Sequence, residues 1–221
     1  MSDDRYGTLV VLACHCVFDP ATNRIYAEHA EDRPIYEAHL SYAFKHLEWR
    51  ANISPLLVIS GGPTKVQRHC SESRSYIELA ETIRLTAPAN VELEEYALTS
   101  IENLLLSLYI YHRTRKVYPQ SVEVISWEFK RARFEQTLQA INNWAQLGQE
   151  WPPLKFFPVG DLWGKPKEKA LVVEKDYINA LQKGINAYHE DPQVQTVISN
   201  RDVFNSRDKA RAFYTGYQLP F

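Results

Sequence analysis

Four short segments of the chain contain side chains that could bind or transform a small molecule. The first is Cys14-His15-Cys16, at the end of the apolar run TLVVLACHC. A histidine there could titrate near neutral pH and transfer protons. A core histidine bonded to the backbone explains it equally well. Alternation along a strand would place both thiols opposite His15, so a catalytic Cys–His pair between these neighbours is not expected.

The second segment combines glycines with a helix start. Ser60-Gly61-Gly62 ends the apolar run PLLVIS, and Ser71-Glu72-Ser73 precedes a helical period. Glycines after a strand let backbone amides approach an anionic ligand, and the free N–H groups at a helix N-terminus favour negative charge. A turn followed by a helix, with Ser71 as its cap and Glu72 in its first turn, explains the same residues. Spacing alone favours this structural explanation.

The third segment is Glu94-Glu95, followed by Thr99-Ser100-Ile101-Glu102-Asn103. Thr99 and Glu102 fit a capping box, which explains both residues without any function. Asn103 would lie in the first helical turn, although an amide side chain prefers local turn bonding to a helix interior. Glu95, Ser100 and Asn103 are therefore candidate site residues.

The fourth segment, SWEFKRAR over 126–133, follows the run SVEVIS. Lys130 and Arg133 are three residues apart and share one helical face. Two fixed cations could hold a phosphate or carboxylate, with Arg133 offering a bidentate fork. A solvated basic patch is the simpler explanation. However, cations at a helix N-terminus oppose the helix dipole, and such a local conflict points to function.

The common cofactor and metal motifs are absent. No G-x-G-x-x-G follows the first apolar run, and the chain has no G-x-x-x-x-G-K-[ST] and no G-x-S-x-G. These absences disfavour a nicotinamide enzyme, a P-loop NTPase and an α/β-hydrolase. Neither H-E-x-x-H nor paired C-x-x-C occurs, so a zinc site would need scattered ligands. We therefore predict no metal site.

The elements that must hold these segments alternate between apolar runs and helical periods. Strands are predicted over 8–16, 55–60, 91–96, 121–126 and 154–159, and helices over 34–50, 72–86, 100–117, 128–147 and 174–189. This alternation predicts an α/β fold: a single-domain open, mostly parallel, doubly wound Rossmann-like sheet with helices on both faces. Ligands bind such sheets at the carboxyl ends of the strands, near a topological switch point. The four segments all follow predicted strands.

Two later segments are less regular. Gly160, Gly164 and Pro166 favour a loop over 160–169, which could act as a mobile cover of the site. Residues 190–221 are predicted to form an irregular or helical extension, with a short helix from Ser206. The domain is expected to span residues 1–221.

Composition narrows the class of protein. The 221 residues include 25 basic and 27 acidic side chains, a net charge of −2, whereas a nucleic-acid-binding protein normally has a basic surplus. The longest apolar run is six residues, and a membrane helix needs about 20. The start, Met-Ser-Asp-Asp-Arg, is unlike a secretory signal, and three cysteines cannot all pair. We expect a cytoplasmic protein with a small-molecule substrate; the oligomeric state stays open.

Taken together, the four segments resemble the YdcF/SanA-like family of Rossmann-like proteins, known as a domain of unknown function. The resemblance is closer to the fungal branch, which has a CH pair after the first strand, an EEYA–ENLLFSL segment and an EFKRxRF segment. Here these read CH at 14–15, EEYA at 94–97 with ENLLLSL at 102–108, and EFKRARF at 128–134. The match is strongest over residues 8–135.

Three positions depart from the family pattern. Bacterial members show FHxxR where this chain has Phe129-Lys130-x-x-Arg133, so any role of that histidine would fall to Lys130. Fungal members tend to have histidine where this chain has Trp127, and bacterial members have glycines after the first strand. The resemblance also implies S-adenosylmethionine binding or a role in envelope biology as options, although this fold supports many chemistries.

Our first hypothesis is a small-molecule enzyme that uses metal-independent general acid–base catalysis for hydrolysis, elimination or cyclisation, without a cofactor. The strand ends would bring a proton-transfer set to a polar or anionic metabolite, and amides at Gly61-Gly62 would complete an oxyanion-type site. Two carboxylates in one pocket would repel, so one should act as the acid. The expected catalytic residues are His15, Glu72, Glu95 and Lys130. The expected substrate-binding residues are Gly61, Gly62, Ser71, Ser100, Asn103, Ser126, Glu128 and Arg133.

Two alternatives remain. The first is an S-adenosylmethionine- or nucleotide-binding protein, with or without methyl transfer, in which Glu94, Glu95 or Asp161 would hold ribose hydroxyls; the missing glycine-rich loop counts against it. The second is a non-catalytic binding module, whose strand-end polar groups would pair among themselves and leave no pocket. Both ligand-binding hypotheses require Glu72, Asn103 and Arg133 to face one cavity.

Overall fold

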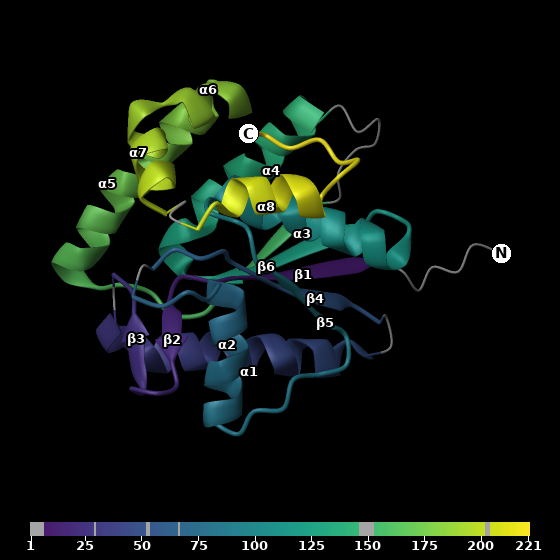
Figure 1. Cartoon of the computed structure of the whole chain (residues 1–221), viewed down its shortest axis with the longest axis vertical. Helices are drawn as coiled ribbons and strands as arrows, with labels where there is room; N and C mark the ends of the chain where they lie inside the picture. The colour runs from purple at the N-terminus through teal and green to yellow at the C-terminus, as the bar shows by residue number, and fades with distance from the viewer. Residues whose placement is uncertain (1–6, 29, 52–53, 66, 146–152, 202–203) are drawn as a thin grey trace.

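The computed structural model describes residues 7–28, 30–51, 54–65, 67–145, 153–201 and 204–221 (Figure 1). The strands are β1 (Thr8–Ala13), β2 (Val17–Asp19), β3 (Arg24–Tyr26), β4 (Leu56–Ser60), β5 (Val91–Glu94), β6 (Ser121–Ser126) and β7 (Leu154–Pro158). The helices are α1 (Arg33–Trp49), α2 (Glu72–Thr82), α3 (Ser100–Arg115), α4 (Arg131–Ala145), α5 (Gly164–Leu181), α6 (Ile185–Glu190), α7 (Pro192–Arg201) and α8 (Ser206–Phe213).

Five parallel strands form one sheet in the order β5-β4-β1-β6-β7. All six residues of β1 are buried, because helices cover both faces of a parallel sheet. Helices α1 and α2 pack on one face, and α3 and α4 pack on the other (Figure 1). The predicted α/β, parallel, doubly wound sheet is therefore confirmed.

The strand order creates a switch point between β1 and β6. The chain runs from β1 through α1 to β4 and through α2 to β5, on one side of β1. Helix α3 then returns the chain to β6, on the other side of β1. The connection that leaves β1 runs toward β4, whereas the connection that leaves the neighbouring strand β6 runs the other way, toward β7. A crevice therefore opens between the carboxyl ends of β1 and β6.

Residues 61 and 62 are glycines because neighbouring groups approach them closely. A Cβ atom on Gly62 would lie 2.8 Å from the backbone carbon of Tyr96 and 2.9 Å from the carbonyl oxygen of Ala97. One on Gly61 would lie 2.8 Å from Cβ of Cys14 and 2.9 Å from a carboxylate oxygen of Glu72. The two glycines thus let β4, α2 and the loop after β5 pack together where the site forms.

We expect Gly62→Ala to lower the free energy of unfolding by about 1–3 kcal/mol, because backbone atoms cannot move aside as a flexible side chain can. Gly7→Ala is the matched control, since its new Cβ would lie 3.6 Å from the Gln120 side chain, an ordinary contact. Urea unfolding of both variants measures the difference. Equal stability of the two variants would contradict this explanation of Gly62.

The predicted loop over 160–169 is wrong in its second half, because α5 begins at Gly164, ten residues before the predicted helix start. The predicted helix over 174–189 is also two helices. Gly184, with φ of 105°, lies between α5 and α6 and changes the chain direction. The apolar spacing of Tyr177, Leu181, Ile185 and Tyr188 continues across this break, so periodicity did not reveal it.

The C-terminal region is more regular than the sequence indicated. Asp191-Pro192 ends the preceding helix, as its turn-forming residues indicate, because α6 stops at Glu190. Pro192 is then the first residue of α7, a position that proline favours. The short helix predicted from Ser206 is confirmed as α8. The antiparallel hairpin of β2 and β3 was not predicted. Within the described residues, no helix is long and apolar enough to cross a membrane.

Candidate functional site

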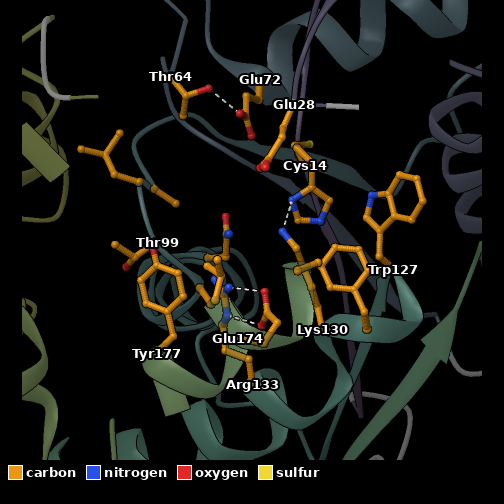
Figure 2. A pocket seen from close by; sticks show the side chains of 18 of the residues that line it. Cys14, Glu28, Thr64, Glu72, Thr99, Trp127, Lys130, Arg133, Glu174 and Tyr177 are labelled. Atoms are coloured by element: carbon orange, nitrogen blue, oxygen red, sulfur yellow. Dashed lines mark hydrogen bonds and ion pairs between the residues drawn. The ribbon is translucent and has the colours of Figure 1, made fainter. Parts of the chain in front are cut away.

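A cavity of about 520 Å³ lies at the carboxyl ends of the parallel strands (Figure 2). Its walls come from the segments after β1, β4, β5 and β6, from the start of α3, and from one side of α5. Predicted site residues that line it are His15, Glu72, Ser100, Asn103, Lys130 and Arg133. The three side chains that both ligand-binding hypotheses placed together, Glu72, Asn103 and Arg133, are therefore on one cavity.

His15 lies at the switch point and is held by the last residue of β6 and by the segment that follows this strand. Its Nε2 is 2.8 Å from Ser126 Oγ. Its Nδ1 is 2.9 Å from Lys130 Nζ, and Figure 2 marks this second contact with a dashed line at Lys130. If Lys130 is an ammonium it can only donate, so Nδ1 accepts and the ring proton lies on Nε2, directed at Ser126. Transfer of that hydrogen-bonded proton from Nζ to Nδ1 would make Lys130 an amine and His15 the cation. The contact thus joins two groups that can exchange one proton next to the cavity.

A cluster of aromatic rings that includes His39 lies beside His15. Tyr36 and Trp127 line the cavity, and the His39 ring lies 6.5 Å from that of His15. Nε2 of His39 donates to the carbonyl of Val159 at 2.7 Å, and burial lowers the pKa of His39 to about 4. His39 is thus a neutral, fixed ring that packs behind the cavity-lining rings of Tyr36 and Trp127. Sequence reasoning missed this histidine, because a buried core residue gives no signal at that position.

Two further carboxylates, those of Glu72 and Glu28, line the cavity. Glu72 is the first residue of α2 and is buried, and Thr64 Oγ1 donates to its carboxylate. Glu28, in the segment after β3, lines the same cavity (Figure 2). The analysis of the sequence did not identify Glu28, since nothing there indicated the β2–β3 hairpin that carries it. The carboxylate pair expected from Glu72 and Glu95 is instead Glu72 and Glu28.

Arg133 is part of a buried ion pair. Its Nε donates to Glu174 Oε2 at 2.5 Å, and its Nη2 donates to Oε1 of the same carboxylate. Nη1 donates to Ser100 Oγ at 3.2 Å, and the guanidinium lies 4.1 Å from the Tyr177 ring centroid. The predicted anion clamp of Lys130 and Arg133 is therefore already engaged by partners of the protein itself. Two cations at a helix start are unfavourable because they oppose the helix dipole. Here Lys130 is hydrogen-bonded to His15, and Arg133 is paired with Glu174.

Thr99, Ser100 and Asn103 bring the start of α3 to the cavity. The predicted capping box is confirmed in part, because Thr99 accepts from the Glu102 amide at 3.3 Å, whereas the Glu102 carboxylate accepts from Leu98 N at 2.6 Å. Ser60 Oγ, at the end of β4, is 2.8 Å from Asn103 Oδ1. This contact leaves the amide nitrogen as the group that Asn103 offers to the cavity.

The amides of Gly61 and Gly62 do not form the predicted oxyanion-type site. Gly61 N donates to Glu94 O at 3.0 Å, and Gly62 N donates to Ala97 O at 2.7 Å. The first amides of α2 are used in the same way, since Glu72 N and Ser73 N donate to the carbonyls of Gly62 and Gly61 at 3.0 Å. These glycines allow close packing of neighbouring backbone segments, and their amides are already hydrogen-bonded within the protein.

Four further predicted residues do not line the cavity. Glu95 forms an ion pair with Arg74 at 3.1 Å and accepts from Ser71 Oγ at 2.8 Å. Ser71 caps α2 by accepting from the amide of Arg74 at 3.1 Å. Glu128 is paired with Arg131 at 2.8 Å. Ser126 is fully buried behind His15, where it can orient the imidazole.

The thiol of Cys14 also faces the cavity, and its pKa is raised, first by burial and second by Glu72. A protonated thiol is a poor nucleophile, so Cys14 acts as an apolar wall.

Helix α5 supplies cavity residues that the sequence did not indicate. Lys165 and Lys169 stand one turn apart on α5, and Lys65 comes from the loop after β4. All three line the cavity, and the two α5 lysines are exposed at its edge. Helical periodicity could have located them, but only if the helix had been extended back to Gly164.

In the part of the chain that the structure describes, no three His, Cys, Asp or Glu side chains form a group that could hold a metal ion. No family model, no curated protein and no solved structure matches this chain.

Proposed function

We propose that this protein is a cytoplasmic small-molecule enzyme that works by general acid–base catalysis, with the His15–Lys130 pair and Glu72 as its proton-transfer groups. The observation that carries the proposal is the hydrogen-bonded chain Lys130–His15–Ser126 at the switch point. The buried hydroxyl of Ser126 orients the imidazole, and Lys130 contacts the other ring nitrogen. An imidazole that is oriented in this way by polar partners is expected of a proton-transfer residue.

The chemistry follows from opposite charges on one cavity. The His15–Lys130 pair carries one transferable proton, and Glu72 is a buried carboxylate held by Thr64. One group can protonate a leaving oxygen while the other removes a proton from water or from the substrate, which are the steps that hydrolysis, elimination and cyclisation need. The cavity volume of about 520 Å³ suits a metabolite of moderate size.

A polar or anionic substrate fits the charges around the cavity. Glu174 compensates Arg133, so the remaining lining charges are those of Lys65, Lys130, Lys165 and Lys169 against Glu28 and Glu72. This cationic surplus favours an anionic ligand. Membership of the YdcF/SanA-like family is part of the proposal. It is supported by the fact that His15, Glu72, Asn103, Lys130 and Arg133, taken from its separate motifs, line one cavity.

The test is a thermal-shift screen with sulfate, small carboxylates, sugar phosphates, nucleotides and S-adenosylmethionine. A ligand at about 100 times its dissociation constant adds roughly 2.7 kcal/mol to the free energy of unfolding, a rise of several degrees in melting temperature. We expect a shift with an anionic class, lost in Lys130→Ala because the cation next to His15 is removed. Arg131→Ala is the matched control, since that neighbouring cation pairs with Glu128 and does not line the cavity.

Turnover of the class that binds is then followed by proton NMR with His15→Asn and Glu72→Gln. Loss of turnover with retained binding in these variants supports acid–base catalysis. Binding without any turnover in the parent protein would contradict the enzyme proposal and favour a binding module. A shift only with S-adenosylmethionine would favour the second hypothesis, for which the aromatic rings of Tyr36, Trp127 and Tyr177 on the cavity could contact the adenine.

A further inference from the structure

Ser60 lies between two groups that both require its single hydroxyl proton. Its Oγ is 2.8 Å from Glu94 Oε2 and 2.8 Å from Asn103 Oδ1. A serine hydroxyl has one proton and accepts through its lone pairs, so it can donate to only one of these oxygens. At the other 2.8 Å contact, the partner of Ser60 must itself donate a proton to Ser60 Oγ. Ser60 and Glu94 are fully buried and Asn103 is nearly so, so water is a poor substitute for that donor.

Two arrangements satisfy both contacts. When Glu94 is protonated, its carboxyl donates to Ser60, Ser60 donates to Asn103 Oδ1, and the amide nitrogen is left for the cavity. When Glu94 is ionised, it accepts from Ser60, and Asn103 must turn its amide by 180° so that its nitrogen donates to Ser60 Oγ. Its carbonyl oxygen is then left for the cavity. The orientation in the structure is the first of these.

We propose that Glu94 and Ser60 form a relay in which the protonation of Glu94 decides whether Asn103 offers the cavity an N–H donor or a carbonyl acceptor. Glu94 and Ser60 are positioning residues, and Asn103 is the residue that meets the ligand. The donor state suits a carboxylate, phosphate or carbonyl oxygen of a ligand, and the acceptor state suits a hydroxyl or ammonium group. The meaning for catalysis rests on the proposed function; the relay itself does not.

The surroundings of Glu94 make both states accessible near neutral pH. Burial raises its pKa to about 7, although the amides of Tyr96 at 2.8 Å and Ala97 at 3.1 Å donate to it and act in the opposite direction. These amide bonds persist in both states, so only the Ser60 side of the carboxyl changes.

The other titratable groups around Glu94 come from four elements. They are Cys14 after β1, Tyr96 after β5, Glu102 on α3 and Tyr214 after α8, whose hydroxyl donates to Glu94 Oε1 at 3.4 Å. Burial is the first cause that raises the pKa of Cys14, Tyr96 and Tyr214, so these groups stay neutral. The charge of Glu102 is paired with Arg207 at 3.2 Å.

The decisive measurement is NMR of the ligand-free protein between pH 5 and pH 9. The side-chain amide signal of Asn103 is assigned by its absence in Asn103→Ser, the carboxyl carbon of Glu94 is followed in parallel, and the exposed Asn179 is the internal reference. We expect both signals to titrate together with a midpoint near 7. The donor and acceptor states would then stand at about ten to one at pH 6 and one to ten at pH 8.

Two variants separate the relay from a simple field effect. In Glu94→Gln, the amide nitrogen of Gln can donate to Ser60 as a protonated carboxyl would, so the Asn103 signal should become independent of pH. In Ser60→Ala, Glu94 should still titrate while Asn103 no longer follows. The relay is overturned if Asn103 still follows Glu94 in Ser60→Ala, if Asn103 stays constant while Glu94 titrates in the parent protein, or if Glu94 does not titrate in this range. None of these outcomes bears on whether the enzyme has a substrate.

Discussion

Replacement of Glu174 by Ala is expected to lower the free energy of unfolding by about 3–5 kcal/mol, because it leaves the guanidinium of Arg133 buried without a counter-charge. The two side chains are only 11% and 6% exposed, and their contact is bidentate. The buried residues of α5 are Glu174, Ala180 and Leu181, so this ion pair is a main anchor of the helix. Urea unfolding measures the loss of stability, and hydrogen exchange measures whether α5 opens first.

The control for this prediction is Glu128→Ala, which removes a carboxylate from an exposed pair with Arg131 near the start of α4. Its cost should stay below about 1 kcal/mol. The double variant Arg133→Met with Glu174→Leu should regain most of the stability, since an apolar pair of similar volume replaces both charges. If Glu174→Ala cost no more than Glu128→Ala, the ion pair could not be what fixes α5 over the cavity.

The sheet was predictable from sequence because its three central strands, β4, β1 and β6, are buried on both faces. Runs such as TLVVLA and SVEVIS contain apolar side chains on both alternating faces, and their short length and β-branched residues favour buried strands over helices. The helices between these strands were predictable from their apolar residues at helical spacing. The carboxyl ends of the strands were therefore the predicted place of the site, although the strand order stayed open. The structure shows that the order places His15 Nδ1 2.9 Å from Lys130 Nζ.

The residues that sequence reasoning missed depend on contacts between distant parts of the chain. Glu94 and Glu95 are neighbours, yet one is buried against Ser60 and the other is paired with Arg74 at the surface. Nothing local to the two glutamates determines which of them turns inward. Similarly, Glu174 occupies a buried position of α5 only because Arg133 is there to receive it. Because residue 174 is charged, the apolar periodicity of this segment did not indicate that it lies on the buried face of α5.

The free energy of unfolding should depend on pH through Glu94. Its pKa in the folded protein is about 7, above the ordinary value of 4.5, so folding favours the protonated form. The stabilisation that this preference provides is complete below about pH 4.5 and is lost as the pH rises through 7. Glu94→Gln does not titrate, so its stability relative to the parent protein should increase by about 2–3 kcal/mol between pH 5 and pH 8.

Comparison of the two proteins by urea unfolding at several pH values isolates this effect. Burial lowers the pKa of His39 and His189 to about 4, so both histidines weaken the folded state as the pH falls, but they do so equally in parent and variant and cancel in the difference. Glu92→Gln, at an exposed position two residues earlier on β5, is the matched control for the change from a carboxyl to an amide. A flat difference for Glu94→Gln would mean that the buried carboxyl keeps one charge state throughout. Asn103 would then present the cavity with one fixed group at every pH in this range.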